Sequence, residues 1–364
     1  MDADPKLTRR EMLTRTAGAV VAAGAAATAG YLLHDPIGDA GLPRPSDATR
    51  RLKDFFTGIE LPAGTPRISV ATGEESAIEQ MVRTAIGRLD PDLGLRRFVT
   101  RGDVVLIKPN AGFDRAPHLG ATTHPDVIRA LVRMCLEAGA ASVIITDNPI
   151  EAPEACFARS GIKRAAEETG AKLVLPEQRR FETVVVRDNE PAADRGEALG
   201  RWSMLYAPLR EATKVIGVAP IKDHNLCGGS MNLKNWYGLL GGRRNQFHQA
   251  IHHIISDLGW MISPTLVVAD GTRVMMRNGP TGGRISDVKP GGEVGRPTVV
   301  AAVDPVACDA WCYRHLLGRD PAKLAYLGMA ARKIAAETAA GSKRLGEADW
   351  QAYQRRGQVA TANV

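Results

Sequence analysis

DVVLIKPN, residues 103–110, decides the fold class of this chain. Its apolar run is unbroken from Val104 to Ile107, as in a parallel strand whose two faces are both covered by helices. SVIITDN, residues 142–148, repeats the pattern, and the stretch between them reads as a helix that begins at Pro125 and stops at Gly139. These consecutive strand and helix units predict an α/β protein with a mainly parallel, doubly wound sheet and helices on both faces.

The same alternation continues in both directions along the chain. Strands are expected at 67–72, 172–175, 183–187, 214–218, 266–269 and 298–303, and helices at 76–89, at 154–169, around 247–258 and after Asp304. We therefore predict one α/β domain over residues 61–320, with two lobes divided near 198–213 as the alternative. Residues 321–364 are expected to form a helix and a polar tail.

The N-terminus has the features of a twin-arginine export signal. Arg9 and Arg10 precede an uncharged stretch, Thr16 to Leu33, that is built mainly of Ala and Gly. Such a stretch is less apolar than a typical membrane-spanning helix. Residues 1–34 are thus interpreted as a signal or an N-terminal anchor, and 35–60 as a linker. The interpretation predicts export in folded form by the twin-arginine translocation machinery to the periplasm or another extracytoplasmic space, with a membrane tether if the signal is not cleaved.

Composition and motifs narrow the function classes. The chain has 364 residues, 44% of them hydrophobic, which permits a packed core and excludes disorder for most of its length. Its net charge of +7 is scattered and only 5% of its residues are aromatic, so nucleic-acid binding is not expected. The five cysteines include no CxxC pair and predict neither a disulfide framework nor an iron-sulfur cluster. GxSxG, GxGxxG and Walker A sequences are absent.

Polar residues follow the predicted strands at the points where they end. In an open parallel sheet, ligands bind beyond the carboxyl ends of the strands, because the loops and helix N-termini meet there. The side chains expected to converge are Lys108 and Asn110, Asp147 and Asn148, Lys222 with Asp223 and His224, Asp270, and Asp304. Each alone is also explained as a helix cap or a loop charge.

The stretch 219–257 holds the densest chemistry. Lys222, Lys234, Arg243 and Arg244 alternate with paired glycines and predict a site for a carboxylate or phosphate, although a flexible surface connection also explains the glycines. His248 and His252 have the i, i+4 spacing with which two imidazoles bind one divalent metal; His224, Asp223 and Asp257 are candidate third ligands. The glutamate of an HExxH protease motif is missing.

The order of these segments resembles the domain of unknown function 362 family. The resemblance is carried by Lys108-Pro109-Asn110, the run from Pro220 to His224, Leu233-Lys234-Asn235, Asp270-Gly271, and Asp304-Pro305 with Asp309. It covers about residues 67–318. The family is bacterial and archaeal, has no securely assigned general activity, and often carries a ferredoxin-like iron-sulfur module whose cysteines this chain lacks.

The resemblance implies a site made of Lys108, Asn110, Lys222, His224, Lys234, Asn235, His248, Asp270 and Asp309. We assign catalytic roles to Lys108, Lys222, His224 and Lys234, and substrate binding to Asn110, Asn235, Arg243 and Arg244. A divalent metal, if bound, is expected on His224, His248, His252, Asp270 and Asp309. The predicted function is an enzyme for a small anionic substrate or cofactor. The alternative is a non-catalytic metal- or cofactor-binding or maturation factor for a periplasmic redox partner.

Overall fold

The computed structural model describes residues 52–185, 199, 201–339 and 345–364. The predicted signal and the first part of the linker lie outside the described residues. Ten strands form one mixed sheet, in the order β12-β1-β11-β9-β7-β2-β3-β4, with β10 added to β9 and β8 to β7. The strands are β1 (Ile68–Thr72), β2 (Val104–Lys108), β3 (Ser142–Ile145), β4 (Lys172–Leu173), β7 (Lys214–His224), β8 (Gly228–Ser230), β9 (Leu266–Met275), β10 (Val288–Lys289), β11 (Thr298–Ala302) and β12 (Val359–Asn363).

Most of the central pairings are parallel. β4, β3, β2, β7 and β9 pair with one another in parallel, whereas β11 runs antiparallel to both β9 and β1. The carboxyl ends of β2, β3 and β7 therefore meet at one edge of the sheet. The predicted fold class is confirmed.

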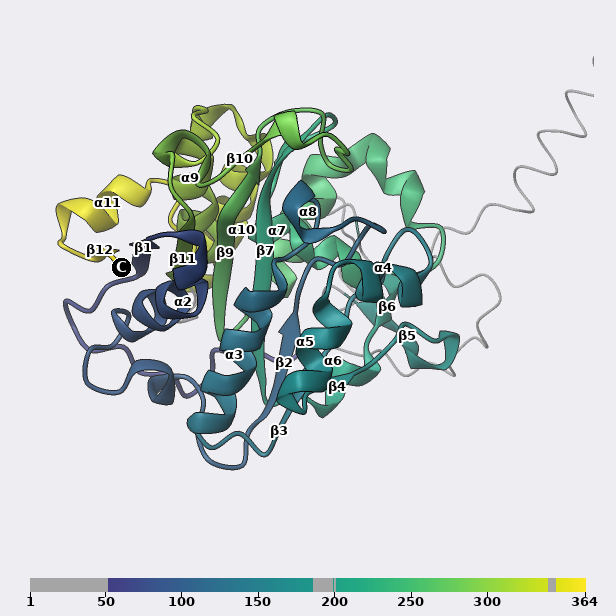
Figure 1. The fold of residues 1–364 in the computed structure, drawn as a ribbon, viewed down its shortest axis with the longest axis horizontal. Helices are drawn as coiled ribbons and strands as arrows, with labels where there is room; N and C mark the ends of the chain where they lie inside the picture. Colours follow the sequence, from purple (N-terminus) through teal and green to yellow (C-terminus); the bar gives the residue numbers. More distant parts are fainter. Residues whose placement is uncertain (1–51, 186–198, 200, 340–344) are drawn as a thin grey trace, which may run out of the picture.

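Helices cover both faces of the sheet (Figure 1). One face packs against α2 (Ile78–Gly87), α3 (Pro125–Glu137) and α5 (Ile162–Thr169), and the other against α7 (Asn232–Asn235), α8 (Ile251–Met261), α9 (Pro305–His315) and α10 (Ala325–Ala339). In β2, Val105 and Ile107 point to the first layer and Leu106 to the second, all fully buried. Because side chains alternate along a strand, a continuous apolar run supplies both cores at once.

Several elements differ from the predicted ones. The helix expected at 154–169 is split into α4 (Pro153–Arg159) and α5, because Gly161 between them has a φ of 76°. β5 (Phe181–Val185) pairs with an unpredicted strand, β6 (Arg201–Leu205), in a separate two-stranded sheet, and α6 (Ala207–Glu211) follows. β7 and β9 continue to His224 and Met275, beyond their predicted ends.

The C-terminal segment is more ordered than predicted. After α11 (Trp350–Arg355), the expected polar tail forms β12, which pairs in parallel with β1 along its whole length. Its sequence, VATAN, mixes small apolar and polar residues, and as an edge strand it is held by backbone hydrogen bonds to β1 on one side only.

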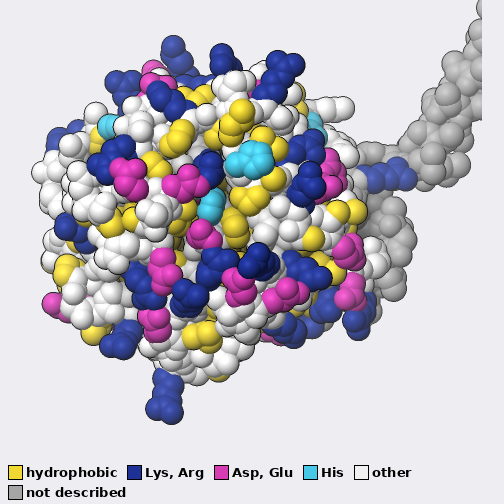
Figure 2. Space-filling model, in the orientation of Figure 1, with side chains coloured by type: hydrophobic (Ala, Val, Ile, Leu, Met, Phe, Trp, Pro, Cys, Tyr) yellow, Lys and Arg dark blue, Asp and Glu magenta, His cyan; other side chains and the backbone are white. Residues whose placement is uncertain are grey.

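Surface charges of both signs are interspersed on the face shown in Figure 2. No helix among the described residues is long and apolar enough to cross a membrane. All five cysteines are unpaired and buried.

Candidate functional site

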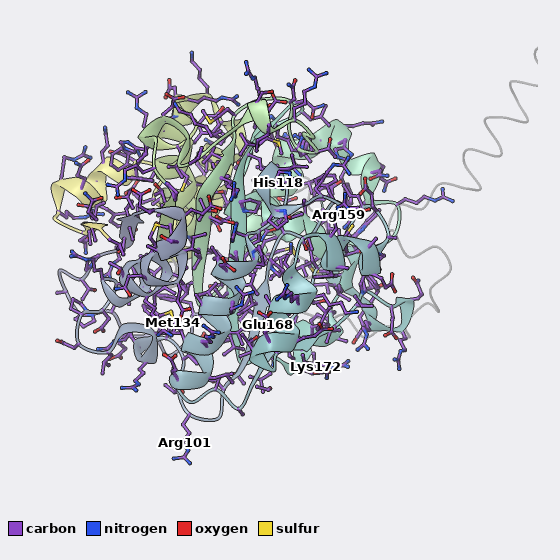
Figure 3. All side chains as sticks on the ribbon, viewed as in Figure 1. Arg101, His118, Met134, Arg159, Glu168 and Lys172 are labelled. Atoms are coloured by element: carbon purple, nitrogen blue, oxygen red, sulfur yellow. The ribbon has the colours of Figure 1, made fainter. Side chains whose placement is uncertain are left out.

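A cavity of about 140 Å³ lies beyond the carboxyl ends of β2, β3 and β7. In Figure 3, Arg101, just before β2, lies at the lower edge of the molecule, and His118, in the segment after β2, lies in the upper half, so β2 runs upward in this view. The charged or imidazole side chains that line the cavity are Lys108, Asp147, Lys222, His224, Lys234, Arg244 and His248. Its volume is close to the 150 Å³ or so that holds a benzene molecule in a protein interior.

Lys108 forms a fully buried ion pair. Its Nζ lies 2.6 Å from Asp147 Oδ1, and it donates to the backbone oxygen of Pro109 (2.7 Å) and to Asn235 Oδ1 (2.8 Å). Burial lowers the pKa of Lys108, and the Asp147 carboxylate opposes that shift. Three acceptors, one of them anionic, match the three N–H bonds of an ammonium group. The three N–H bonds of Lys108 are therefore all directed at acceptors within the protein, in the geometry of a buried ion pair.

Because Gly238 has no side chain, the ion pair of Lys108 and Asp147 fits against its backbone. A Cβ atom at residue 238 would lie 2.2 Å from Asp147 Oδ1 and 2.7 Å from Lys108 Nζ. The backbone oxygen of Gly238 also accepts the N–H of Asn148. The glycine thus lets the segment after α7 pack directly on the loop after β3.

Asn235 ties the ends of two strands together. Its Nδ2 donates to the backbone oxygens of Lys108 (3.1 Å) and Val218 (3.2 Å), at the ends of neighbouring β2 and β7. Asn110 is more open, with its Oδ1 3.4 Å from Lys222 Nζ and its Nδ2 3.4 Å from Asn235 Oδ1. The side-chain amide of Asn235 therefore makes its hydrogen bonds to other parts of the protein. The hydrogen bonds of the Asn110 side chain are longer, so a ligand can replace them more easily.

Lys222 differs from Lys108 in its partners. Its Nζ donates to the backbone oxygen of Ala121 (2.7 Å) and to Asn110 Oδ1, and it lies 5.2 Å from the centroid of the Phe113 ring. No carboxylate lies within ion-pair distance of it among the described residues. Burial, followed by the positive charge of Lys234, lowers the pKa of Lys222 to about 7.

Lys234 is the least satisfied cation of the cavity. It lies on α7 and its Nζ is 5.0 Å from the centroid of the Tyr237 ring. Within the described part of the chain, this Nζ has no hydrogen-bond acceptor and no carboxylate partner. Its partly buried side chain lines the cavity, and burial lowers its pKa. Because burying an ammonium group without a partner is costly, an anion in the cavity would stabilise this arrangement.

The two cavity histidines have complementary hydrogen-bonding roles. His224 Nδ1 accepts the N–H of Leu226 (3.2 Å), so its neutral ring carries the proton on Nε2. Burial and then the charges of Lys234 and Lys222 lower the pKa of His224 to about 2, which keeps the ring neutral. His248 Nδ1 lies 2.8 Å from the backbone oxygen of Asn245 and, in the neutral ring, donates to it, which leaves Nε2 as an acceptor. The cavity therefore holds one imidazole donor and one imidazole acceptor.

Of the two arginines predicted to bind substrate, only Arg244 lines the cavity. Arg244 lines the cavity, but its guanidinium donates to the backbone oxygens of Leu240, Asn148 and Pro149 and holds the loop after β3. Arg243 is exposed and does not line the cavity.

The predicted metal ligands are not brought together. His224 and His248 line the cavity, while His252 stacks on Tyr326 with ring centroids 6.0 Å apart. His248 lies in a 3-10 helix, Arg244–Ala250, and His252 in α8, so the i, i+4 spacing no longer places both rings on one face. Among the described residues, no group of three or more His, Cys, Asp or Glu side chains is placed to hold a metal ion.

The two aspartates among the predicted metal ligands, Asp270 and Asp309, accept hydrogen bonds from backbone N–H groups. Asp270 Oδ2 accepts the N–H of His124 at the start of α3, and Oδ1 accepts from Thr272. Asp309 accepts the N–H groups of Asn232 and Leu233 at the start of α7, each at 2.9 Å. Burial raises the pKa of Asp309 to about 7. Asp309 thus positions the short helix that carries Lys234 and Asn235.

Asp304 was expected at the same edge and lies elsewhere. It follows β11, which is antiparallel to β9, so its strand ends at the opposite edge of the sheet. There its Oδ1 caps α9 and its Oδ2 accepts the hydroxyl of Tyr353. For Asp304, the alternative interpretation given above, that of a helix cap, is correct.

Other lining residues were missed by the sequence reasoning. Phe113, Tyr237 and Ser230 line the cavity, as do the rim residues Ile150 and Leu226, which are 60% and 52% exposed. Phe113 and Ile150 follow β2 and β3 by a few residues, so their place after a strand end was the available signal. Leu226 lies between β7 and β8, and nothing in the sequence indicated that hairpin.

Comparison with known proteins gives a family-model match. The family model described as "Domain of unknown function (DUF362)" matches residues 105–314. A thylakoid-associated protein of Synechocystis sp. is 27% identical over 244 residues, which are 65% of this chain and 70% of that protein.

Solved structures are more distant. The lactate racemase apoprotein of Thermoanaerobacterium thermosaccharolyticum shares 14% identity at a TM-score of 0.36, over 59% of this chain and 52% of that one. A protein of Thermotoga maritima shares 14% identity at a TM-score of 0.37, over 56% of this chain and 52% of that one. The chain thus spans about half the length of both proteins.

Proposed function

This chain belongs to the family of the domain of unknown function 362. From that premise, we propose that its cavity binds a small organic anion and that the protein transfers a proton to or from this ligand. One observation carries the proposal: Lys234 Nζ faces the cavity without an acceptor or a carboxylate partner among the described residues. An anionic ligand supplies the missing charge.

The charge balance of the cavity supports an anion. Four basic side chains, Lys108, Lys222, Lys234 and Arg244, line it together with one carboxylate, that of Asp147. Asp147 is committed to Lys108, and Arg244 to backbone oxygens. Lys222 and Lys234 are therefore the groups available to a ligand. Because both side chains are at least partly buried, an anion is attracted by Lys234, and by Lys222 when it is protonated, more strongly than by a lysine on an open surface.

The histidines support proton transfer. General acid and base catalysis needs a donor and an acceptor within reach of one ligand. His224 Nε2–H supplies the donor, and His248 Nε2 supplies the acceptor. His224 stays neutral because of its lowered pKa, so it acts as a hydrogen-bond donor and not as a cation.

The exposed apolar rim favours a second candidate function, that of a carrier. Ile150 and Leu226 are largely exposed and both line the cavity, so a partner protein that covers its opening would bury them. In this function, the protein holds an anionic cofactor for a redox partner without changing it. Hydrogen exchange separates the two functions: proton transfer predicts that the protein incorporates deuterium from D₂O into a bound carbon acid such as pyruvate, and the carrier function predicts binding alone.

The first experiment measures the thermal stability of the protein with acetate, lactate, pyruvate and inorganic phosphate. We expect at least one anion to raise the melting temperature of the wild type, since a ligand at 100 times its Kd adds about 2.7 kcal/mol of stability. Lys234→Met should lose the response and Lys234→Arg should keep part of it. Lys163→Met, on the exposed face of α5, is the matched control and should respond as the wild type does. An equal response of Lys234→Met and the wild type would overturn the proposal.

A further inference from the structure

The two cavity lysines without a carboxylate partner are brought together by one hairpin. Lys222, near the end of β7, pairs with Ser230 of β8, and Lys234 follows on α7. The electrostatic influence of Lys234 on Lys222 agrees with this proximity. Two lysine Nζ atoms that line one small cavity can bind two different functional groups of the same ligand.

The partners of Lys222 fit a neutral amine. A neutral amine has two N–H bonds and one lone pair, and Nζ has two uncharged acceptors, the backbone oxygen of Ala121 and Asn110 Oδ1. Lys108 shows the contrasting case, with three acceptors that include a carboxylate. The lowered pKa of Lys222, about 7, agrees with a large neutral fraction near neutral pH. Burial next to a second cation is a known way to activate a lysine as a nucleophile.

Resting on the proposed function, we propose that Lys222 forms an imine with the ketone or aldehyde of a small oxo acid whose carboxylate is held by Lys234. Pyruvate has the same number of non-hydrogen atoms as benzene, so a ligand of this class fits a cavity of about 140 Å³. The substrate class is thus a short oxo carboxylate.

The reaction balances without a further reagent. Lys222 Nζ bonds to the carbonyl carbon, and the carbonyl oxygen leaves as water with the two hydrogens that the amine carried. His224 Nε2–H is the cavity donor for the departing oxygen. A proton from solvent then converts the imine to an iminium ion, whose nitrogen withdraws electrons from the adjacent carbon. His248 Nε2 is the acceptor for the proton released there, which leaves a neutral enamine. Water reverses the step and frees the lysine.

The test traps the imine by reduction. Wild-type protein is incubated with pyruvate and sodium borohydride, and the adduct is located by mass spectrometry of the intact chain and of its peptides. We expect one reduced pyruvyl group per chain, on Lys222, and competition by lactate, which has the carboxylate but no ketone. Lys222→Arg and Lys222→Met should remove the adduct, and Lys234→Met should reduce its formation at least tenfold. Circular dichroism of each variant confirms that it is folded.

The outcomes separate the two proposals. If pyruvate raises the melting temperature but Lys222 is not modified, the imine is excluded and anion binding stands. If neither occurs with any of the anions tested, both proposals fail. An adduct on Lys234 or Lys108, or one shared equally with the exposed Lys163, also overturns the assignment of Lys222.

Discussion

At the residue scale, Lys222 is expected to lower the stability of the native protein at neutral and acidic pH. Its pKa in the folded protein, about 7, lies below its ordinary value of 10.5. The unfolded chain therefore binds more protons between these two pH values, and native stability rises with pH across that range. We expect Lys222→Met to increase the free energy of unfolding by about 2–5 kcal/mol at pH 6. The gain should shrink above pH 7 and vanish near pH 10.5, as measured by urea denaturation at each pH.

Lys108 supplies the matched contrast because it is buried with a carboxylate partner. Lys108→Met would leave Asp147 buried without a cation, and removal of one member of a buried ion pair costs about 3–5 kcal/mol. The same urea experiment at pH 6 should thus give changes of opposite sign for the two variants. A stabilised Lys108→Met protein would contradict the assignment of a charged ion pair to that residue.

At the element scale, β12 protects the edge of the sheet away from the cavity. It covers β1, and three further strands, β11, β9 and β7, separate it from β2. Truncation after Arg356 removes the backbone hydrogen bonds of β12 and leaves β1 as an open edge, so we expect stability to fall by a few kcal/mol and aggregation to increase. The measurements are thermal unfolding and light scattering. The response to anions should persist in the truncated protein, and its loss would show that the two regions are coupled.

At the scale of the whole molecule, the expected export depends on residues outside the described part of the chain. Arg9 and Arg10 are the residues that the twin-arginine translocation machinery is expected to recognise. We expect Arg9→Lys with Arg10→Lys to leave the protein in the cytoplasm, folded and with its response to anions unchanged. Cell fractionation with an antibody against the chain measures this. Equal amounts of wild type and variant outside the cytoplasm would contradict an export signal.

The sequence by itself determined the fold class and the region of the site. Continuous apolar runs such as residues 104–107 require cover on both faces, and parallel strands place their carboxyl ends at one edge. The sequence alone therefore predicted that four side chains lie at one edge of the sheet, and all four line the cavity: Lys108, Asn110, Lys222 and His224. β12 was not predicted because its pairing partner, β1, lies almost 300 residues before it in the sequence. β6 was not predicted although its partner, β5, is the preceding strand of the chain.

The tertiary structure alone decided the role of each side chain. A lysine in the sequence does not show whether a carboxylate will reach it, so Lys108 and Lys222 looked alike until Asp147 was seen beside only one of them. The antiparallel direction of β11 moved Asp304 to the other edge. The change from 3-10 to α-helix separated His248 from His252. Pairing, strand direction and helix geometry depend on contacts between distant segments, and those contacts exist only after the chain has folded.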